Sequence, residues 1–320
     1  MPVPARRALA AVAAACLTVA VLAGCGGSAK SSAPRNVPRS SLSQDGMDMN
    51  GMDGMNMNGS GDDMPGMGQP SGPKIAAAAP ADNGLHAGLG GYSYVADTAM
   101  LPAASAAPFT FHITGPGGKT VTRFQPYEAQ LLVFYIIRSD LADFHQLTAT
   151  MRQDGTWTVP MPALAAGAYR TYVTFAAPDS SAGTPLSYSL SRPLTVSGSA
   201  TAVPLPAVSD TVTADGYSLH LTGTPRHGTD TDLGVAVTKN GQPVKQFDRI
   251  LDGYAHLTAF HSGDTAFVRA LSTGRSAGGP SGAGALTAKI LFSQPGTWRL
   301  FVQFDTAGAE HTAAFTVDVP

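Results

Sequence analysis

An internal repeat restricts the fold of this chain more than any other feature of its sequence. The segment Gly-Ala-Tyr-Arg-Thr-Tyr-Val-Thr-Phe at 167–175 returns as Gly-Thr-Trp-Arg-Leu-Phe-Val-Gln-Phe at 296–304. Similar segments in one order along the chain indicate a duplicated structural unit. The sequence therefore predicts two related halves that divide near Ala200. Two more pairs of similar segments support this interpretation: 109–124 with 233–247, and 144–149 with 254–259.

Both halves have the residue pattern of β-strands. Short β-branched and aromatic runs, such as 130–138 and 313–319, are bounded by Gly, Pro and Asp turn residues. The chain also contains 36 glycines and 24 prolines, which disfavour helices because glycine costs backbone entropy and proline removes a hydrogen-bond donor. We predict an all-β fold with two tandem immunoglobulin-like β-sandwich domains, at 81–200 and 201–320. A barrel is the alternative.

The repeated segment at 296–304 also predicts which side chains are buried. Alternation along a strand places its apolar residues on one face, and these are Trp298, Leu300, Val302 and Phe304. Arg299 and Gln303 fall on the other face. Arg299 and its counterpart Arg170 are expected at exposed positions or in hydrogen bonds between sheets.

The amino terminus reads as an export signal. Arg6 and Arg7 precede an apolar run from Ala8 to Leu22, which is too short to be a stable membrane span. The following Leu22-Ala23-Gly24-Cys25 resembles the lipobox of bacterial lipoproteins. That resemblance implies a signal peptide at 1–24, a lipidated Cys25 and attachment to the outer face of the cytoplasmic membrane. An ordinary secretory signal with a chance cysteine is the alternative, and general-secretory and twin-arginine export both stay open.

The two cysteines leave no thiol for other chemistry under this interpretation. Cys16 departs with the signal peptide and Cys25 carries the lipid, so we expect neither a disulfide nor a type-1 blue-copper site. Residues 25–80, called the tether here, are rich in Ser, Gly, Pro, Asp, Asn and Met. Such a composition cannot bury a core, so the sequence predicts disorder over 25–80 and a mean reach of about 40 Å.

The tether contains a dense group of methionines, called the methionine cluster here. Seven of the eleven methionines belong to it: Met47, Met49, Met52, Met55, Met57, Met64 and Met67. Thioether sulfur is a soft, neutral ligand that prefers Cu(I) to hard ions, and short spacings with intervening glycines let several sulfurs surround one ion. A calcium loop is excluded because no Asp-x-Asp-x-Asp-Gly register with a terminal Glu is present. The sequence therefore predicts a Cu(I) site; a neutral linker is the alternative.

The folded halves resemble a group of actinobacterial secreted and lipid-anchored proteins with Met- or His-rich tails, regarded as copper-handling. Segments that carry the resemblance are 138–149, His256-Leu257 and His311-Thr312-Ala313. The resemblance implies copper as the cofactor and a second-rank metal site of His145, His256 and His311. The alternative for each is a structural histidine. The sequence departs from the group at 264–272, where two expected histidines are absent.

Composition and motifs exclude several functions. With 13% charged residues and a formal net charge of −2, the chain has no basic face for nucleic acid. Gly117-Gly118-Lys119-Thr120 lacks the earlier glycine of a phosphate-binding loop and is interpreted as a hairpin turn. No other catalytic motif occurs, so we do not expect an enzyme. The predicted function is copper binding at the membrane, with an exporter or another copper protein as partner. A lipid-anchored module that binds a protein or wall polymer, or a structural stalk, is the alternative.

Overall fold

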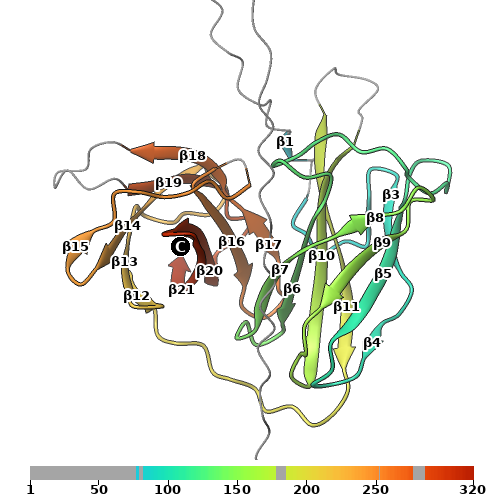
Figure 1. The fold of residues 1–320 in the computed structure, drawn as a ribbon, viewed down its shortest axis with the longest axis horizontal. Helices are drawn as coiled ribbons and strands as arrows, with labels where there is room; N and C mark the ends of the chain where they lie inside the picture. Colours follow the sequence, from blue (N-terminus) through green and yellow to red (C-terminus); the bar gives the residue numbers. More distant parts are fainter. Residues whose placement is uncertain (1–76, 79–81, 178–184, 252, 277–284) are drawn as a thin grey trace, which may run out of the picture. The chain divides into compact units, whose positions relative to one another are not determined.

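The computed structural model describes residues 77–78, 82–177, 185–251, 253–276 and 285–320 of the 320-residue chain (Figure 1). The predicted signal peptide lies outside the described residues, as does the tether except for Ala77 and Ala78. These two alanines form a short strand, β1 (Ala77–Ala78), so ordered pairing begins before residue 80. The described residues all belong to one compact unit.

The described part of the chain consists of strands and contains no helix, which confirms the all-β prediction. The first sandwich has one sheet in the order β2-β3-β5-β9-β8 and a second in the order β1-β11-β10-β6-β7, with β4 parallel to β11. Its further strands are β2 (Gly88–Leu89), β3 (Tyr92–Ala96), β4 (Met100–Leu101), β5 (Ala107–Thr114), β6 (Val133–Arg138), β7 (Phe144–Thr148), β8 (Thr150–Met151), β9 (Trp157–Met161), β10 (Gly167–Ala177) and β11 (Leu186–Val196).

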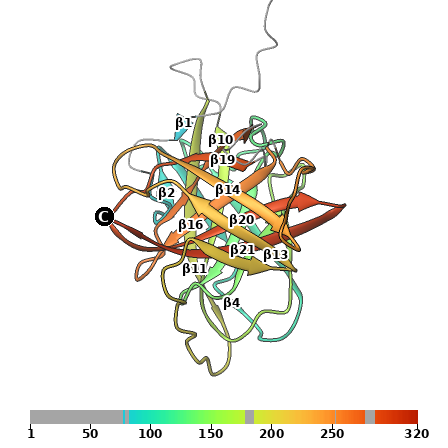
Figure 2. The ribbon, with the colours of Figure 1, turned by 90° about the vertical axis from the view of Figure 1, so that its left-hand side faces the viewer.

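The second sandwich pairs a sheet in the order β12-β13-β14-β19-β18, with β15 on β14, with a sheet in the order β17-β16-β20-β21. Figure 2 views this sandwich from the side of β13 and β14. Its strands are β12 (Thr211–Ala214), β13 (Tyr217–Thr222), β14 (Thr231–Lys239), β15 (Gln242–Pro243), β16 (Ala255–His261), β17 (Phe267–Arg269), β18 (Leu271–Ser276), β19 (Ala285–Ile290), β20 (Gly296–Thr306) and β21 (Ala309–Val319).

The two sandwiches share one strand order, which confirms the predicted duplication. The order β3-β5-β9-β8 corresponds to β13-β14-β19-β18, and β7-β6-β10-β11 corresponds to β17-β16-β20-β21. Both orders are those of an immunoglobulin fold, in which a four-stranded sheet packs on a second sheet that contains the last two strands of the domain. These last two strands are β10 and β11 in the first sandwich and β20 and β21 in the second. The repeated segments 167–175 and 296–304 form β10 and β20 at equivalent positions.

One predicted equivalence is wrong. Residues 144–148 form β7, which lies at a sheet edge, whereas 255–261 form β16, which lies between β17 and β20. The true counterpart of β16 is β6, since each lies beside the equivalent late strand. The two segments have a similar local order of aromatic, His, Leu and Thr residues. Such a local similarity does not determine which strand lies beside each segment in the sheet.

Each sandwich has its own apolar core. In the second sandwich Trp298, Leu300, Val302 and Phe304 are all 0% exposed, as the alternation along β20 predicted. In the first sandwich, Phe111 and Trp157 stack with ring centroids 6.2 Å apart, and both are fully buried. The Gly117–Gly118 segment is a turn after β5, closed by Gly118 N–H donating to the Gly115 carbonyl.

A third apolar cluster joins the two sandwiches. It is formed by side chains on the outer faces of β6 and β10 in the first sandwich and of β16, β17 and β20 in the second. Because these strands already cover a core with their other face, they are buried on both sides. The buried members of this interface cluster are Val133, Tyr135, Ile137, Leu141, Tyr172, Phe260, Phe267 and Phe301.

Candidate functional site

The sites predicted in the tether are not described by the structure. Cys25 and all seven residues of the methionine cluster lie outside the described residues. Lipidation and Cu(I) binding there stay predictions from sequence.

The three candidate histidines lie on different strands, and each has a partner of its own. His145 on β7 donates from Nε2 to Asp143 Oδ1 at 2.8 Å. His311 on β21 is hydrogen-bonded through Nδ1 to Asp215 Oδ2 at 3.0 Å. His256 on β16 contacts Tyr135 through Nε2 at 2.9 Å.

The structure does not bring these histidines into one ligand set. His145 belongs to the first sandwich and the other two to the second. In the sheet of the second sandwich, His256 is paired in register with Gln303, whereas His311 is paired with Phe304. Because adjacent residues of a strand point to opposite faces, His256 and His311 lie on opposite faces of that sheet. Among the residues that the structure describes, no group of three or more His, Cys, Asp or Glu could hold a metal ion.

A buried group of polar and charged side chains lies between the sandwiches, and we call it the interface polar cluster. Its members are Tyr127, Glu128, Tyr135, His256 and Arg269. Arg269 donates from a terminal nitrogen to Glu128 Oε1 at 2.6 Å and lies 4.2 Å above the Tyr127 ring. Glu128 Oε2 is 3.9 Å from His256 Nδ1. The cluster thus links the turn before β6 in the first sandwich to β16 and β17 in the second.

Local backbone geometry positions Glu128 for this contact. Glu128 and Ala129 have φ values of 48° and 58°, in the left-handed region that residues other than glycine seldom adopt. Tyr127 and Gln130 close the turn with reciprocal backbone hydrogen bonds. Two consecutive left-handed residues are maintained only where surrounding contacts compensate for the strain, and the ion pair with Arg269 is one such contact.

Burial controls the protonation of the cluster. Desolvation lowers the pKa of His256 to about 4, so this imidazole is neutral at neutral pH. Desolvation also lowers the pKa of Arg269 to about 9, while its attraction to the nearby Asp82 carboxylate opposes that shift. Burial, and then the Glu128 charge, raise the pKa of Tyr135. At neutral pH the cluster therefore holds one ion pair and a neutral His–Tyr hydrogen bond.

A second set of contacts crosses the same interface. The hydroxyl of Tyr172 on β10 donates to the backbone carbonyl of Thr265, which lies in the turn before β17. Arg170 donates to Thr265 Oγ1 and to Ser191 Oγ, each at 3.1 Å. The bond to Ser191 stays within one sheet, whereas the bond to Thr265 joins the two sandwiches. The counterpart of Arg170, Arg299, donates to Thr316 Oγ1 at 2.7 Å, on the neighbouring strand.

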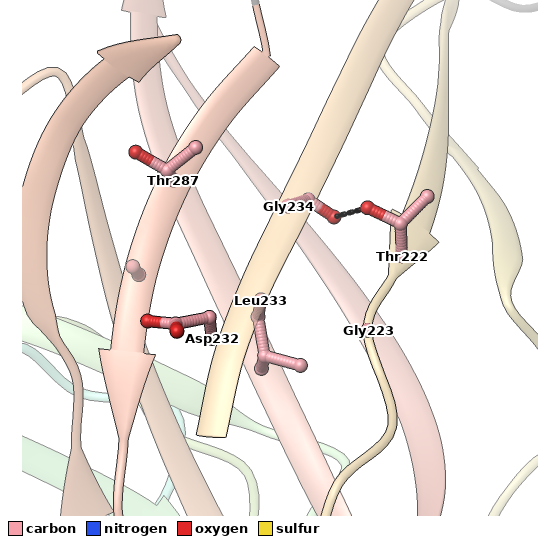
Figure 3. Close-up of a pocket in the computed structure, with 7 residues that line it drawn as sticks. Thr222, Gly223, Asp232, Leu233, Gly234 and Thr287 are labelled. Atoms are coloured by element: carbon pink, nitrogen blue, oxygen red, sulfur yellow. Dashed lines mark hydrogen bonds between the residues drawn. The ribbon is translucent and has the colours of Figure 1, made fainter. Parts of the chain in front are cut away.

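A shallow depression lies on the outer face of the second sandwich (Figure 3). Its volume is about 380 Å³, and its lining residues are Thr222, Gly223, Asp232, Leu233, Gly234, Thr287 and Ala288. A Cβ at Gly234 would lie 2.6 Å from Thr222 Oγ1, so glycine lets the Thr222 side chain lie close to β14. Its one carboxylate, on Asp232, is paired with Lys289 at 3.2 Å. The lining offers small hydroxyl and apolar groups and no cluster of groups suited to catalysis or metal binding.

Sequence reasoning did not find the interface polar cluster. A signal was present, since 131–137 is apolar at almost every position instead of alternating. A strand that is apolar on both faces is expected to be covered on both sides. Glu128, one of only two glutamates in the chain, lies three residues before the start of this run. Among the described residues there is no helix that is long and apolar enough to cross a membrane.

Comparisons with known proteins match only part of this chain. A family model described as a domain of unknown function (DUF8832) matches residues 211–320, from the start of β12 to the end of the chain. No curated protein matches the chain. Solved structures give distant similarity only, so the fold assignment depends on the strand pairing of this chain itself.

Three of these solved structures show how distant the similarity is. A DUF4426 family protein from Pseudomonas aeruginosa is 15% identical with a TM-score of 0.28, over 34% of this chain and 96% of that one. The Escherichia coli adhesin FdeC is 15% identical with a TM-score of 0.23, over 77% and 67%. Yersinia pseudotuberculosis InvD is 14% identical with a TM-score of 0.22, over 72% and 57%.

Proposed function

We propose that this chain is a lipid-anchored extracytoplasmic protein that binds Cu(I) through the methionine cluster at 47–67. The observation that carries the proposal is the placement of seven of eleven methionines in this one short segment. No other apolar residue accompanies them there, so a buried core does not account for them. Thioether ligands need no deprotonation and prefer soft monovalent copper.

The contacts of the folded domains support binding in the tether over binding in the sandwiches. His145 and His311 are each engaged by an aspartate, and His256 by Tyr135. A cation near His256 would also meet the positive charge of Arg269, which is held on the same glutamate. The docked sandwiches then serve as a platform that presents the tether to an exporter or another copper protein.

A Cu(I) titration tests this function. The mature chain from Cys25, with Cys25→Ser so that no thiol competes, is titrated without oxygen against a Cu(I) chelator. We expect the chain to withdraw Cu(I) from the chelator, and the variant with all seven cluster methionines changed to serine to withdraw none. Met100→Ser is the matched control, because Met100 is a 60% exposed methionine outside the cluster. Equal binding by the seven-serine variant and the parent would refute the proposal.

The second candidate is a lipid-anchored module whose sandwiches bind a protein or a wall polymer, with the tether as a spacer. It is favoured by the segment 264–272, where the two histidines expected from the copper-handling group are absent. The same titration distinguishes the two candidates, because a pure spacer binds no Cu(I) in either variant.

A further inference from the structure

The segment Asp82–His86, called the strap here, lies against strands of both sandwiches. It precedes β2 in the chain, and it directly follows the tether. The strap is therefore the route by which the tether is joined to the folded unit.

On the side of the first sandwich, the strap follows the edge of β11 that faces away from β10. Ala77 and Ala78 of β1 pair in parallel with Leu186 and Ser187 at the start of β11. Two residues further along β11, the Ser189 amide donates to Asp82 Oδ2 at 2.7 Å. Two residues beyond that, the Ser191 amide donates to the His86 carbonyl at 2.8 Å. Two successive edge amides of β11, those of Ser189 and Ser191, thus donate to the strap.

On the side of the second sandwich, the strap contacts β17. The Phe267 amide donates to the Asn83 carbonyl at 2.9 Å. Gly84 has a φ of +70°, and a Cβ there would lie 2.7 Å from Phe267 Cβ, so only glycine fits at this position. Leu85 packs against the core of the second sandwich. The strap therefore bonds to one sandwich through Asp82 and His86 and to the other through Asn83 and Leu85.

Charges reinforce this arrangement. The Asp82 carboxylate attracts Arg269 of the second sandwich, while it accepts hydrogen bonds from Ser189 of the first and from Gly84. Arg269 in turn donates to Glu128 of the first sandwich. The Arg269 guanidinium is thus ion-paired with a carboxylate of the first sandwich and is also attracted by the carboxylate of the strap.

We propose that the strap is a latch that holds the two sandwiches docked, so that the first ordered residues after the tether control their docking. The latch consists of a few hydrogen bonds along exposed strand edges, which open more readily than a packed core. Withdrawal of the strap frees the Phe267 amide, removes the negative charge of Asp82 that attracts Arg269 and uncovers the side of the interface cluster next to β17. The proposal does not depend on copper binding by the tether.

Side-chain footprinting with hydroxyl radicals tests the latch, because oxidation follows solvent exposure. The full mature chain is compared with Asp82→Ala and with Gly84→Ala. We expect a several-fold rise in the oxidation of Tyr172 and Phe301, which are buried between the sandwiches, and no change at Trp157 in the first core. Two variants are used because they disturb the strap by different means, a lost carboxylate and an added Cβ.

Asp154→Ala is the matched control. Asp154 also accepts a hydrogen bond from the amide two residues later, at 2.9 Å, but it lies in an exposed turn of the first sandwich. Unchanged oxidation of Tyr172 and Phe301 in both strap variants would overturn the proposal, since docking would then not need the strap. Equal increases at the interface and at Trp157 would also overturn it, because the strap would then belong to the folding core.

Discussion

Arg269 of the second sandwich and Glu128 of the first form a 2.6 Å ion pair in which both side chains are largely buried, at 8% and 13% exposed. This pair lies beside the apolar residues that join the sandwiches. A buried ion pair fixes relative position more than it adds stability, because desolvation offsets much of the attraction. Removing one partner is costly, since the remaining charge stays buried without its counter-ion.

Glu128→Ala is therefore expected to destabilise the chain by about 3–5 kcal/mol, the usual cost of breaking a buried pair. Urea unfolding followed by tryptophan fluorescence measures the change. Asp232→Ala is the control, because its partner Lys289 is 38% exposed and Asp232 itself 80%. That exposed pair contributes less than about 1 kcal/mol. Similar losses in the two variants would show that Glu128 is not a structural ion.

Acid is expected to weaken the fold through His256. Its pKa is about 4 in the folded chain and 6.5 when unperturbed, so the unfolded chain binds the proton more tightly. The stabilisation from the neutral imidazole is complete above pH 6.5 and is lost as the pH falls from 6.5 to about 4. The loss amounts to about 3 kcal/mol.

His256→Gln removes this dependence in part, and the measurement is unfolding free energy against pH for the parent and the variant. The difference between their curves should change across pH 4 to 6.5 and be flat above it. His220→Gln is the control, because His220 is exposed on β13. If the curves of the parent and His256→Gln stay parallel, His256 is not the group that senses acid.

Two glycines offer a matched test of how β20 begins. Gly296 has a φ of +124°, and a Cβ there would lie 2.7 Å from His261 Nε2, whereas Gly216 has a φ of +79° and open space around it. Gly216→Ala should cost about 1 kcal/mol from backbone strain alone. Gly296→Ala should cost about 2–3 kcal/mol more, since the His261 side chain must also move. Thermal unfolding measures the loss of stability in both variants. Equal losses would show that the His261 side chain moves away from the new Cβ at no cost in free energy.

Periodicity in the sequence predicted the sandwiches but not their docking. Alternation along β20 correctly identified Trp298 and Phe304 as core residues, because that face always meets the opposite sheet. The other face of the same sheet has no fixed partner in the fold class. Whether Phe301 meets solvent or another domain depends on surfaces far away in the sequence, such as the outer face of β6.

For the candidate histidines too, local pattern predicts the face of the strand but not the partner across the interface. The ring of His311 lies 5.3 Å from that of Phe304, on the face of β21 that alternation assigns to Phe315. The partners of His256 were not predictable, because Tyr135 and Glu128 are more than a hundred residues away in the chain. Local pattern shows that a side chain is buried and leaves its partner undetermined.

The lipid anchor makes a prediction about where the chain is found. If Cys25 carries the lipid, Cys25→Ser leaves the chain without its acyl chains, and the fraction of the variant from which the signal peptide is removed should move from the membrane fraction to the medium, since the residues after the signal contain no long apolar run. Cys16→Ser is the control, because Cys16 lies within the predicted signal peptide. Fractionation followed by intact-mass measurement checks both variants. Membrane retention of Cys25→Ser at the parent level would contradict the anchor, and an unmodified Cys25 in the parent would do so directly.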